Sequence, residues 1–141
     1  MTLTYYTVNG TFAPNDTDPG QYPNQVAYAL LPSDWQRVAD ALDGLATVSR
    51  LNWIPTDYPA SVYPMGASVN QGVARLAANI AATPPGTPKA LGGYSQGAIV
   101  TSTVWRDHIL NPVGSLHAYL NDFVAAVNWG NPMRCPSLWT K

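Results

Sequence analysis

The sequence predicts an α/β fold, in which a mainly parallel β-sheet has helices on both faces. Short β-prone stretches alternate along the chain with stretches whose apolar residues recur at helical spacing. Parallel strands need long, usually helical and right-handed crossover connections, so this alternation favours a parallel sheet. In such a fold the functional groups are expected at the carboxyl ends of the strands.

The composition favours a single folded domain over residues 1–141. Of the 141 residues, 46% are hydrophobic and 11% are charged, and the formal net charge is −1. This apolar content excludes a disordered chain, and the small charge gives no electrostatic footprint for nucleic acid. The apolar runs are too short for a transmembrane segment, and the first residues lack a signal-peptide pattern. Cys135 is the only cysteine, so we expect an incidental thiol and no internal disulfide.

Four stretches have the residue types expected of strands, and each ends in turn or loop signals. They are residues 3–8, 46–54, 89–94 and 124–129. The carboxyl edge of the sheet should therefore be formed by residues 9–12, 55–66, 95–96 and 130–134.

Helices are predicted between these strands from apolar spacing and capping residues. Ser33 should begin a helix that ends at Gly44, and a second should follow residues 68–71, which have the form of a capping box. A third should cover residues 96–110, and Ser115 could cap a short one. Residues 12–32, which contain four prolines, are expected to be an irregular loop with at most a helical turn near residues 25–30.

Residues 91–97 read Leu-Gly-Gly-Tyr-Ser-Gln-Gly and contain the pattern Gly-x-Ser-x-Gly. Between a strand and a helix this pattern is typical of the sharp nucleophile turn of α/β-hydrolases. Gly93 and Gly97 would be needed because the turn brings backbones close together. Ser95 is therefore the predicted nucleophile, and a core serine in a tight turn is the alternative.

Stabilisation of an oxyanion would require backbone or hydroxyl donors near Ser95. The first predicted donor is the backbone N–H of Gln96, because the residue after the nucleophile usually points its amide into the site. The second should come from the turn after the first strand, where Thr11 is the candidate through its backbone or hydroxyl. An ordinary turn role for Thr11 remains open.

A base for Ser95 is harder to find, because the chain has only two histidines, His108 and His117. His108 lies thirteen positions after Ser95 on one predicted helix, which is roughly 20 Å along the axis. His117 begins the next short helix near the same far edge, so surface roles are expected for both. Asp107 and Asp122 are excluded for the same reason.

The remaining acidic side chains at the expected edge do not complete a triad without an imidazole. They are Asp16, Asp18 and Asp57, which we interpret as solvated or turn-forming residues. Histidine, cysteine and carboxylate side chains show no metal-ligand spacing, so neither a metal nor another cofactor is expected. Aromatic residues that could line an apolar groove for an acyl chain, or simply anchor loops, are Phe12, Tyr22, Tyr58, Tyr63 and Trp129.

Several segments together resemble the mycobacteriophage lysin B family, which is related to cutinases. They include Gly-Tyr-Ser-Gln-Gly at 93–97, Trp-Gly-Asn-Pro-Met-Arg at 129–134, Tyr-Thr-Val-Asn-Gly-Thr at 6–11, Tyr-Pro-Ala at 58–60 and Tyr-Pro-Met at 63–65. The resemblance covers almost the whole chain. It implies a three-layer, cutinase-like α/β-hydrolase and a serine esterase that uses no metal. Members cleave the ester between mycolic acids and arabinogalactan during lysis of the mycobacterial host.

Two departures from the family pattern bear on activity. The family usually has His-Gly-Thr after the first strand, whereas this chain has Asn9-Gly10-Thr11. The triad Asp and His of the family lie beyond the segment that matches residues 129–134, where this chain stops. The fold is therefore expected to be truncated after the strand ending near Trp129, without the catalytic acid and base.

Three interpretations follow from the resemblance. The chain could be the N-terminal part of an esterase completed by another polypeptide, a virion component that uses the scaffold for binding or assembly, or an inactive remnant. The expected partners are a mycolyl-ester glycolipid or another cell-envelope ligand, and a protein chain or second copy that completes the fold. A phage-encoded protein of this kind is made in the host cytoplasm and acts at the mycobacterial envelope or in the virion.

Overall fold

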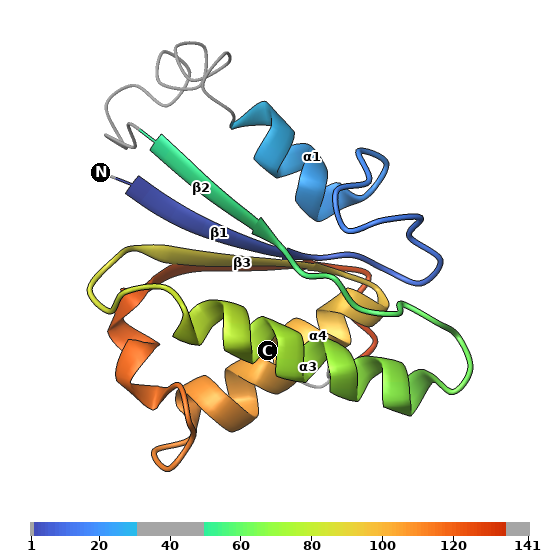
Figure 1. Ribbon diagram of the computed structural model, residues 1–141. Helices are drawn as coiled ribbons and strands as arrows, with labels where there is room; N and C mark the ends of the chain where they lie inside the picture. The colour runs from blue at the N-terminus through green and yellow to red at the C-terminus, as the bar shows by residue number, and fades with distance from the viewer. Residues whose placement is uncertain (1, 31–49, 135–141) are drawn as a thin grey trace, which may run out of the picture.

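The computed structural model describes residues 2–30 and 50–134. Its four strands form one sheet in the order β2-β1-β3-β4, and all neighbouring strands are parallel. β1 (Thr2–Val8) and β3 (Lys89–Tyr94) are central, while β2 (Arg50–Pro55) and β4 (Phe123–Trp129) flank them (Figure 1). The predicted parallel sheet is confirmed. The second strand was expected from residue 46, but residues 46–49 lie outside the described part.

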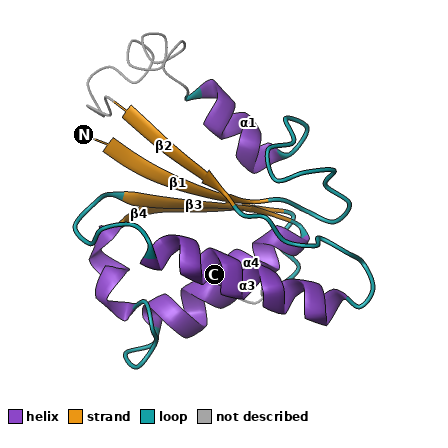
Figure 2. Ribbon diagram, in the orientation of Figure 1, coloured by secondary structure: helices purple, strands orange, loops and turns teal. Residues whose placement is uncertain are grey.

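Helices cover the two faces of the sheet unequally, which gives three layers (Figure 2). α1 (Tyr22–Ala29) lies on one face, and α3 (Met65–Ala81) and α4 (Gln96–Val104) lie on the other. The predicted helix between Ser33 and Gly44 lies outside the described residues, as does Cys135. None of the helices in the described part is long and apolar enough to cross a membrane.

The predicted helix over residues 96–110 is confirmed in extent, but its hydrogen-bonding pattern changes along its length. α4 continues directly into the π-helical segment η1 (Trp105–Leu110), and η2 (His117–Asp122) is a 3₁₀ helix. Ser115 does not cap η2, whose N-cap is Leu116. The Ser115 hydroxyl instead pairs with Nδ1 of His108 at 2.9 Å.

The core follows the alternation of side chains along the central strands. Tyr6, Val8 and Leu91 are buried on the side of α3 and α4, in a cluster with residues of those helices. Tyr5 and Ala90, one position away, belong to a smaller cluster with Ala27 of α1. Both faces of the central strands are thus buried, which is usual for a parallel sheet.

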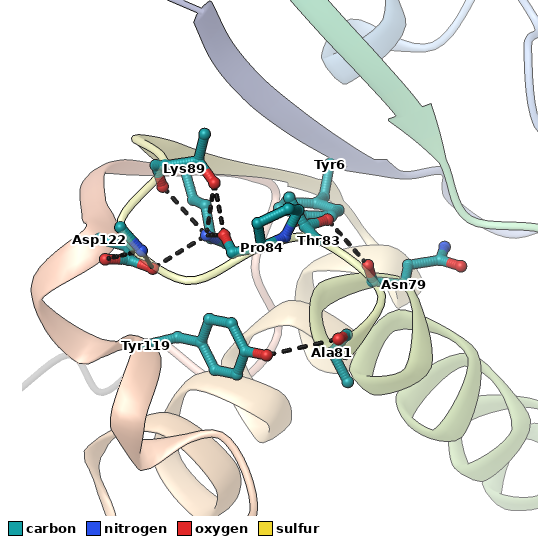
Figure 3. A network of polar contacts seen from close by, with 10 residues as sticks. Tyr6, Asn79, Ala81, Thr83, Pro84, Lys89, Tyr119 and Asp122 are labelled. Atoms are coloured by element: carbon teal, nitrogen blue, oxygen red, sulfur yellow. Dashed lines mark hydrogen bonds and ion pairs between the residues drawn. The ribbon is translucent and has the colours of Figure 1, made fainter.

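The start of β3 is anchored by Lys89, whose side chain is fully buried (Figure 3). Its ammonium group lies 2.9 Å from a carboxylate oxygen of Asp122 and donates to the carbonyl oxygens of Pro84 and Thr87 at 3.0 Å. This anchor fixes the amino end of the strand. Ser95 follows the opposite, carboxyl end of the same strand.

Two predicted helix starts are corrected by the structure. α3 begins at Met65 with Pro64 as N-cap, so Ser68 lies inside the helix and forms no capping box. α1 is a regular helix of 8 residues, where only a turn near residues 25–30 was expected. Pro23 in its first turn does not oppose the helix, because a proline there removes no intrahelical hydrogen bond.

Candidate active site

Ser95 alone makes the turn between β3 and α4. Its backbone has φ 51° and ψ −114°, a conformation rarely adopted by residues other than glycine. Its N–H donates to the carbonyl oxygen of Trp129 at 3.0 Å, and its own carbonyl oxygen accepts from Ala98 at 3.0 Å. The residue is half-buried, and its hydroxyl makes no hydrogen bond within residues 2–30 and 50–134. The sharp turn expected from the sequence is therefore present.

The glycines around Ser95 are explained by close backbone approach. A Cβ on Gly97 would lie 2.1 Å from the carbonyl oxygen of Val8, so α4 could not start so close to β1. A Cβ on Gly93 would lie 2.6 Å from Oγ1 of Thr101 and from Oδ1 of Asn128. Real Cβ atoms do not approach other heavy atoms so closely, so both positions require glycine, as predicted.

The side chain of Gln96 forms hydrogen bonds with the turn after β1, the loop after β2 and α3. These contacts were not predicted from the sequence. Its Nε2 donates to the carbonyl oxygen of Ser61 at 2.9 Å and to the hydroxyl of Thr11 at 3.2 Å. Its Oε1 accepts from the hydroxyl of Ser68 at 2.7 Å. The side chain is buried, with only 1% of the residue surface exposed. The one available signal in the sequence was an amide side chain inside a segment of small residues. Such an amide, if buried, needs hydrogen-bond partners.

Ser68 completes this network on α3. Its hydroxyl oxygen accepts a hydrogen bond from the backbone N–H of Ser61 at 3.1 Å while donating to Gln96. The loop after β2 is thereby held against the start of α4. Neither Ser61 nor Ser68 was predicted as a site residue, because only the packing of three separate segments brings them together.

Thr11 lies in the turn after β1, at the same edge as Ser95. The bond from Gln96 fixes the position of its hydroxyl. The following residue, Phe12, has φ 63° and donates its N–H to the carbonyl oxygen of Ala60 at 3.0 Å, and Ala60 itself has φ 49°. Phe12, Ala60 and Ser95 are thus left-handed non-glycine residues on one edge, and such strain tends to gather at functional sites.

The backbone N–H of Gln96 is at the first position of α4. A helix has no internal acceptor for the N–H groups of its first turn, and the helix dipole adds positive potential there. This N–H and Thr11 are the candidate donors for an oxyanion on a substrate at Ser95. The described geometry brings Ser95, Gln96 and Thr11 to one edge of the sheet.

Both histidines lie at the other end of the molecule. His108 is on η1 and pairs with Ser115, and Nδ1 of His117 pairs with the carbonyl oxygen of Ile109 at 2.9 Å. The helical path from Ser95 to His108 is roughly 20 Å long at 1.5 Å per residue. Neither imidazole is placed to accept the Ser95 proton.

The described carboxylates lie either away from Ser95, as Asp107 and Asp122 do, or at the carboxyl edge of the sheet, as Asp16, Asp18 and Asp57 do. Asp122 pairs with Lys89 at the amino end of β3, and Asp107 pairs with Arg106 on the surface. Hydrogen bonding to that guanidinium lowers the pKa of Asp107. Asp18 accepts a hydrogen bond from the backbone N–H of Gly20 at 2.9 Å, which is the turn-forming role expected of it. Asp16 and Asp57 remain at the carboxyl edge.

The five aromatic residues expected to line a groove are divided. Tyr58 packs against the core beside α3, and its hydroxyl donates to the carbonyl oxygen of Asn9. Tyr22 contacts Trp129 with ring centroids 6.3 Å apart, on the α1 side. Phe12 and Tyr63 are 77% and 88% exposed. These residues therefore do not line one common groove.

Within residues 2–30 and 50–134, histidine, cysteine, aspartate and glutamate form no group of three or more that could hold a metal ion. The candidate catalytic chemistry at Ser95 is that of a serine hydroxyl beside backbone donors. A nucleophile of this kind still needs a proton acceptor.

Comparison with known proteins supports the fold. No protein-family model matches the chain. Endolysin B of Mycobacterium phage L5 is 41% identical over 133 residues, which are 92% of this chain and 45% of the relative. Endolysin B of Mycobacterium phage D29 is 40% identical over the same number of residues and the same shares. The crystal structure of lysin B from mycobacteriophage D29 superposes with a TM-score of 0.71 at 37% identity, over 93% of this chain and 46% of that chain.

This chain is lysin B-like. A cutinase-like protein from Cryptococcus sp. shares the fold, with a TM-score of 0.53 at 24% identity, over 94% of this chain and 54% of that one. The resemblance to lysin B and the cutinase-like α/β fold predicted from the sequence are both confirmed. The lysin B-like chain spans about half the length of the curated relatives it matches.

Proposed function

We propose that this lysin B-like chain forms the nucleophile-bearing part of a phage lysis esterase. The observation that carries the proposal is the strained turn at Ser95, a half-buried residue whose hydroxyl has no partner in the described part of the chain. The similarity to endolysin B proteins supports a role in lysis. The substrate implied by the family resemblance is the ester that joins mycolic acids to arabinogalactan.

In the proposed reaction the Ser95 hydroxyl oxygen attacks the carbonyl carbon of the ester and its proton passes to an imidazole. The negative charge on the carbonyl oxygen is stabilised by the backbone N–H of Gln96 and by Thr11. Collapse of this intermediate releases the sugar alcohol, which takes the proton, and leaves an acyl-Ser95 ester. Water, deprotonated by the same imidazole, then releases the fatty acid.

The imidazole has to come from outside the 141 residues, because both histidines of the chain lie at the far end of the fold. The family resemblance gives the same answer, since its Asp and His follow the segment that matches residues 129–134. We therefore propose that a further segment or partner chain brings the acid and base to Ser95.

The β4 edge is the proposed attachment surface for that partner. In the described part of the chain β4 pairs with β3 alone, and five of its seven residues are exposed. Val124 is 63% exposed and Val127 is 48% exposed. An open strand edge with exposed valines is a template for another strand, which favours completion of the sheet there.

The test is hydrolysis of p-nitrophenyl butyrate by two proteins. One is this chain alone, and the other is this chain fused after Arg134 to the part of D29 lysin B that it does not match. We expect background hydrolysis from the chain alone and Ser95-dependent hydrolysis from the fusion, with Ser95→Ala as the matched control. Hydrolysis by a folded fusion that survives Ser95→Ala would refute the proposal.

A further inference from the structure

A small polar cavity lies between the loop after β1 and the loop after β2. Its volume is about 170 Å³, and it is lined by Asn9, Asp16, Thr56, Asp57 and neighbouring loop residues. A water molecule occupies about 30 Å³ in the liquid, so the space has room for an ion with several waters. Among the residues that the structure describes, no lysine, arginine or histidine lines it.

Two of the lining residues carry buried oxygen atoms that have no partner. Asn9 and Thr56 are each 2% exposed, and in the described part of the chain neither Oδ1 of Asn9 nor Oγ1 of Thr56 makes a hydrogen bond. The orientation of the Asn9 amide is fixed by its other atom. Nδ2 donates to the carbonyl oxygens of Asn15 and Asp16, both at 3.0 Å. Oδ1 of Asn9 therefore points away from these two carbonyl groups. A buried acceptor without a donor is costly, which indicates that something is bound there.

In the described part of the chain, the two carboxylates at the cavity also have no hydrogen-bond or ion-pair partner. Within residues 2–30 and 50–134, no hydrogen bond or ion pair reaches the carboxylate of Asp16 or Asp57. Arg75 lines a neighbouring hollow together with Asp57 but forms no ion pair with it. Asn15 differs, because its Oδ1 already accepts two hydrogen bonds from Thr17.

We propose that this cavity is a calcium-binding site formed by Asn9, Asp16, Thr56 and Asp57. Two carboxylates, an amide oxygen and a hydroxyl oxygen are the hard ligands that calcium prefers, and waters would complete the six to eight that it takes. The ligands come from different loops, so the ion joins residues 9–16 to residues 56–60. It adds to the contacts that already join them, from Tyr58 to Asn9 and from Phe12 to Ala60. Calcium binding at this cavity does not depend on the proposed esterase activity.

The decisive experiment is isothermal titration of chelator-stripped protein with calcium chloride, together with thermal unfolding at the same concentrations. We expect one calcium ion per chain, with a dissociation constant of about 10⁻⁴–10⁻³ M, as is usual for sites with few carboxylates. The unfolding midpoint should rise with calcium concentration, because the ion binds the folded state.

Asp16→Asn and Asp57→Asn should each weaken binding about tenfold or more, since charge on the ligands sets calcium affinity. Asp18→Asn is the matched control, because Asp18 belongs to the same loop but uses its carboxylate on Gly20. A concentration of about 10 mM calcium is well above the dissociation constants of the weakest natural sites. Absence of saturable binding up to that concentration would mean that water alone fills the cavity and would overturn the proposal. Equal affinity in wild type, Asp16→Asn and Asp57→Asn would overturn it as well.

Discussion

The Nε2 atom of Gln96 donates a hydrogen bond to the hydroxyl of Thr11, 85 positions earlier in the chain, at 3.2 Å. This contact joins the turn after β1 to the start of α4. It therefore couples the two candidate oxyanion donors through one side chain. The bonds from the same amide to Ser61 and Ser68 extend the coupling to the loop after β2 and to α3.

Replacing Gln96 by Leu should therefore destabilise the fold. The side chain keeps its size but loses every hydrogen bond, and Ser61 and Ser68 are left with unpaired polar groups. We expect a fall of about 2–4 kcal/mol in the free energy of unfolding, measured by urea denaturation. Gln71→Leu is the control, because Gln71 is exposed on α3 and should change stability by less than about 0.5 kcal/mol. Similar small effects of both substitutions would contradict the stabilising role of the Gln96 hydrogen bonds.

Asp122→Ala should cost more stability than Lys89→Met. The first leaves a fully buried ammonium group without its carboxylate, for which a loss of about 3–5 kcal/mol is typical. The second removes the buried charge and leaves the carboxylate of Asp122, whose side chain is 13% exposed and still accepts from the backbone N–H of Gly86. Asp107→Ala, at the exposed pair with Arg106, should have almost no effect. Urea denaturation of the three variants measures this order. A larger loss of stability from Lys89→Met than from Asp122→Ala would contradict it.

Gly97→Ala should severely destabilise the chain or prevent folding. The added Cβ would meet backbone oxygens of both Val8 and Asn9, which cannot move without displacing β1. Gly66→Ala is the matched control, since a Cβ there meets nothing within 4 Å and lies in the first turn of α3. It should raise stability by up to about 1 kcal/mol. Thermal unfolding followed by circular dichroism compares the two, and a well-folded Gly97→Ala variant would be the unexpected result.

The stability of the fold should fall in alkali. Burial raises the pKa of Tyr5 and of Tyr58 well above the usual value of 10.0. Above about pH 10 the unfolded chain therefore releases protons that the folded chain keeps, so their contribution to stability is complete below pH 10 and is lost above it. Each tyrosine should lower the free energy of unfolding by at most about 1.4 kcal/mol per pH unit.

The contribution of one tyrosine can be isolated by substitution. Tyr58→Phe should make the loss of stability between pH 10 and 11 less steep, because this residue then has no proton to release. Tyr63→Phe, at a position that is 88% exposed, should leave the slope unchanged. Equal slopes for wild type and both variants would show that Tyr58 does not control the alkaline transition.

The turn at Ser95 could be predicted because its causes are local. A short buried strand, a glycine-rich turn and a helix follow one another within residues 89–110. The set of hydrogen bonds made by the Gln96 side chain could not be predicted in the same way. Its partners lie 85, 35 and 28 positions away, and no sequence spacing records which of them the folded chain brings together.

The errors at α1 and α3 have a different cause. The prolines of residues 12–32 favour a loop, yet Pro23 lies in the first turn of α1, where proline is tolerated because the first N–H groups of a helix have no intrahelical acceptor. Ser68 was interpreted as a cap from a four-residue pattern. Its hydroxyl instead bonds to Gln96, so a tertiary contact decided the role of a residue that local pattern assigned differently.

Labelling with a fluorophosphonate probe, followed by mass spectrometry of the labelled peptide, tests the central claim most directly. We predict that this chain alone reacts at background rate and that the fusion to the unmatched part of D29 lysin B is labelled at Ser95. Rapid labelling of Ser95 in the chain alone would place a base within these 141 residues, against the account. Labelling of the fusion at another residue, with Ser95 unmodified, would contradict the assignment of the nucleophile.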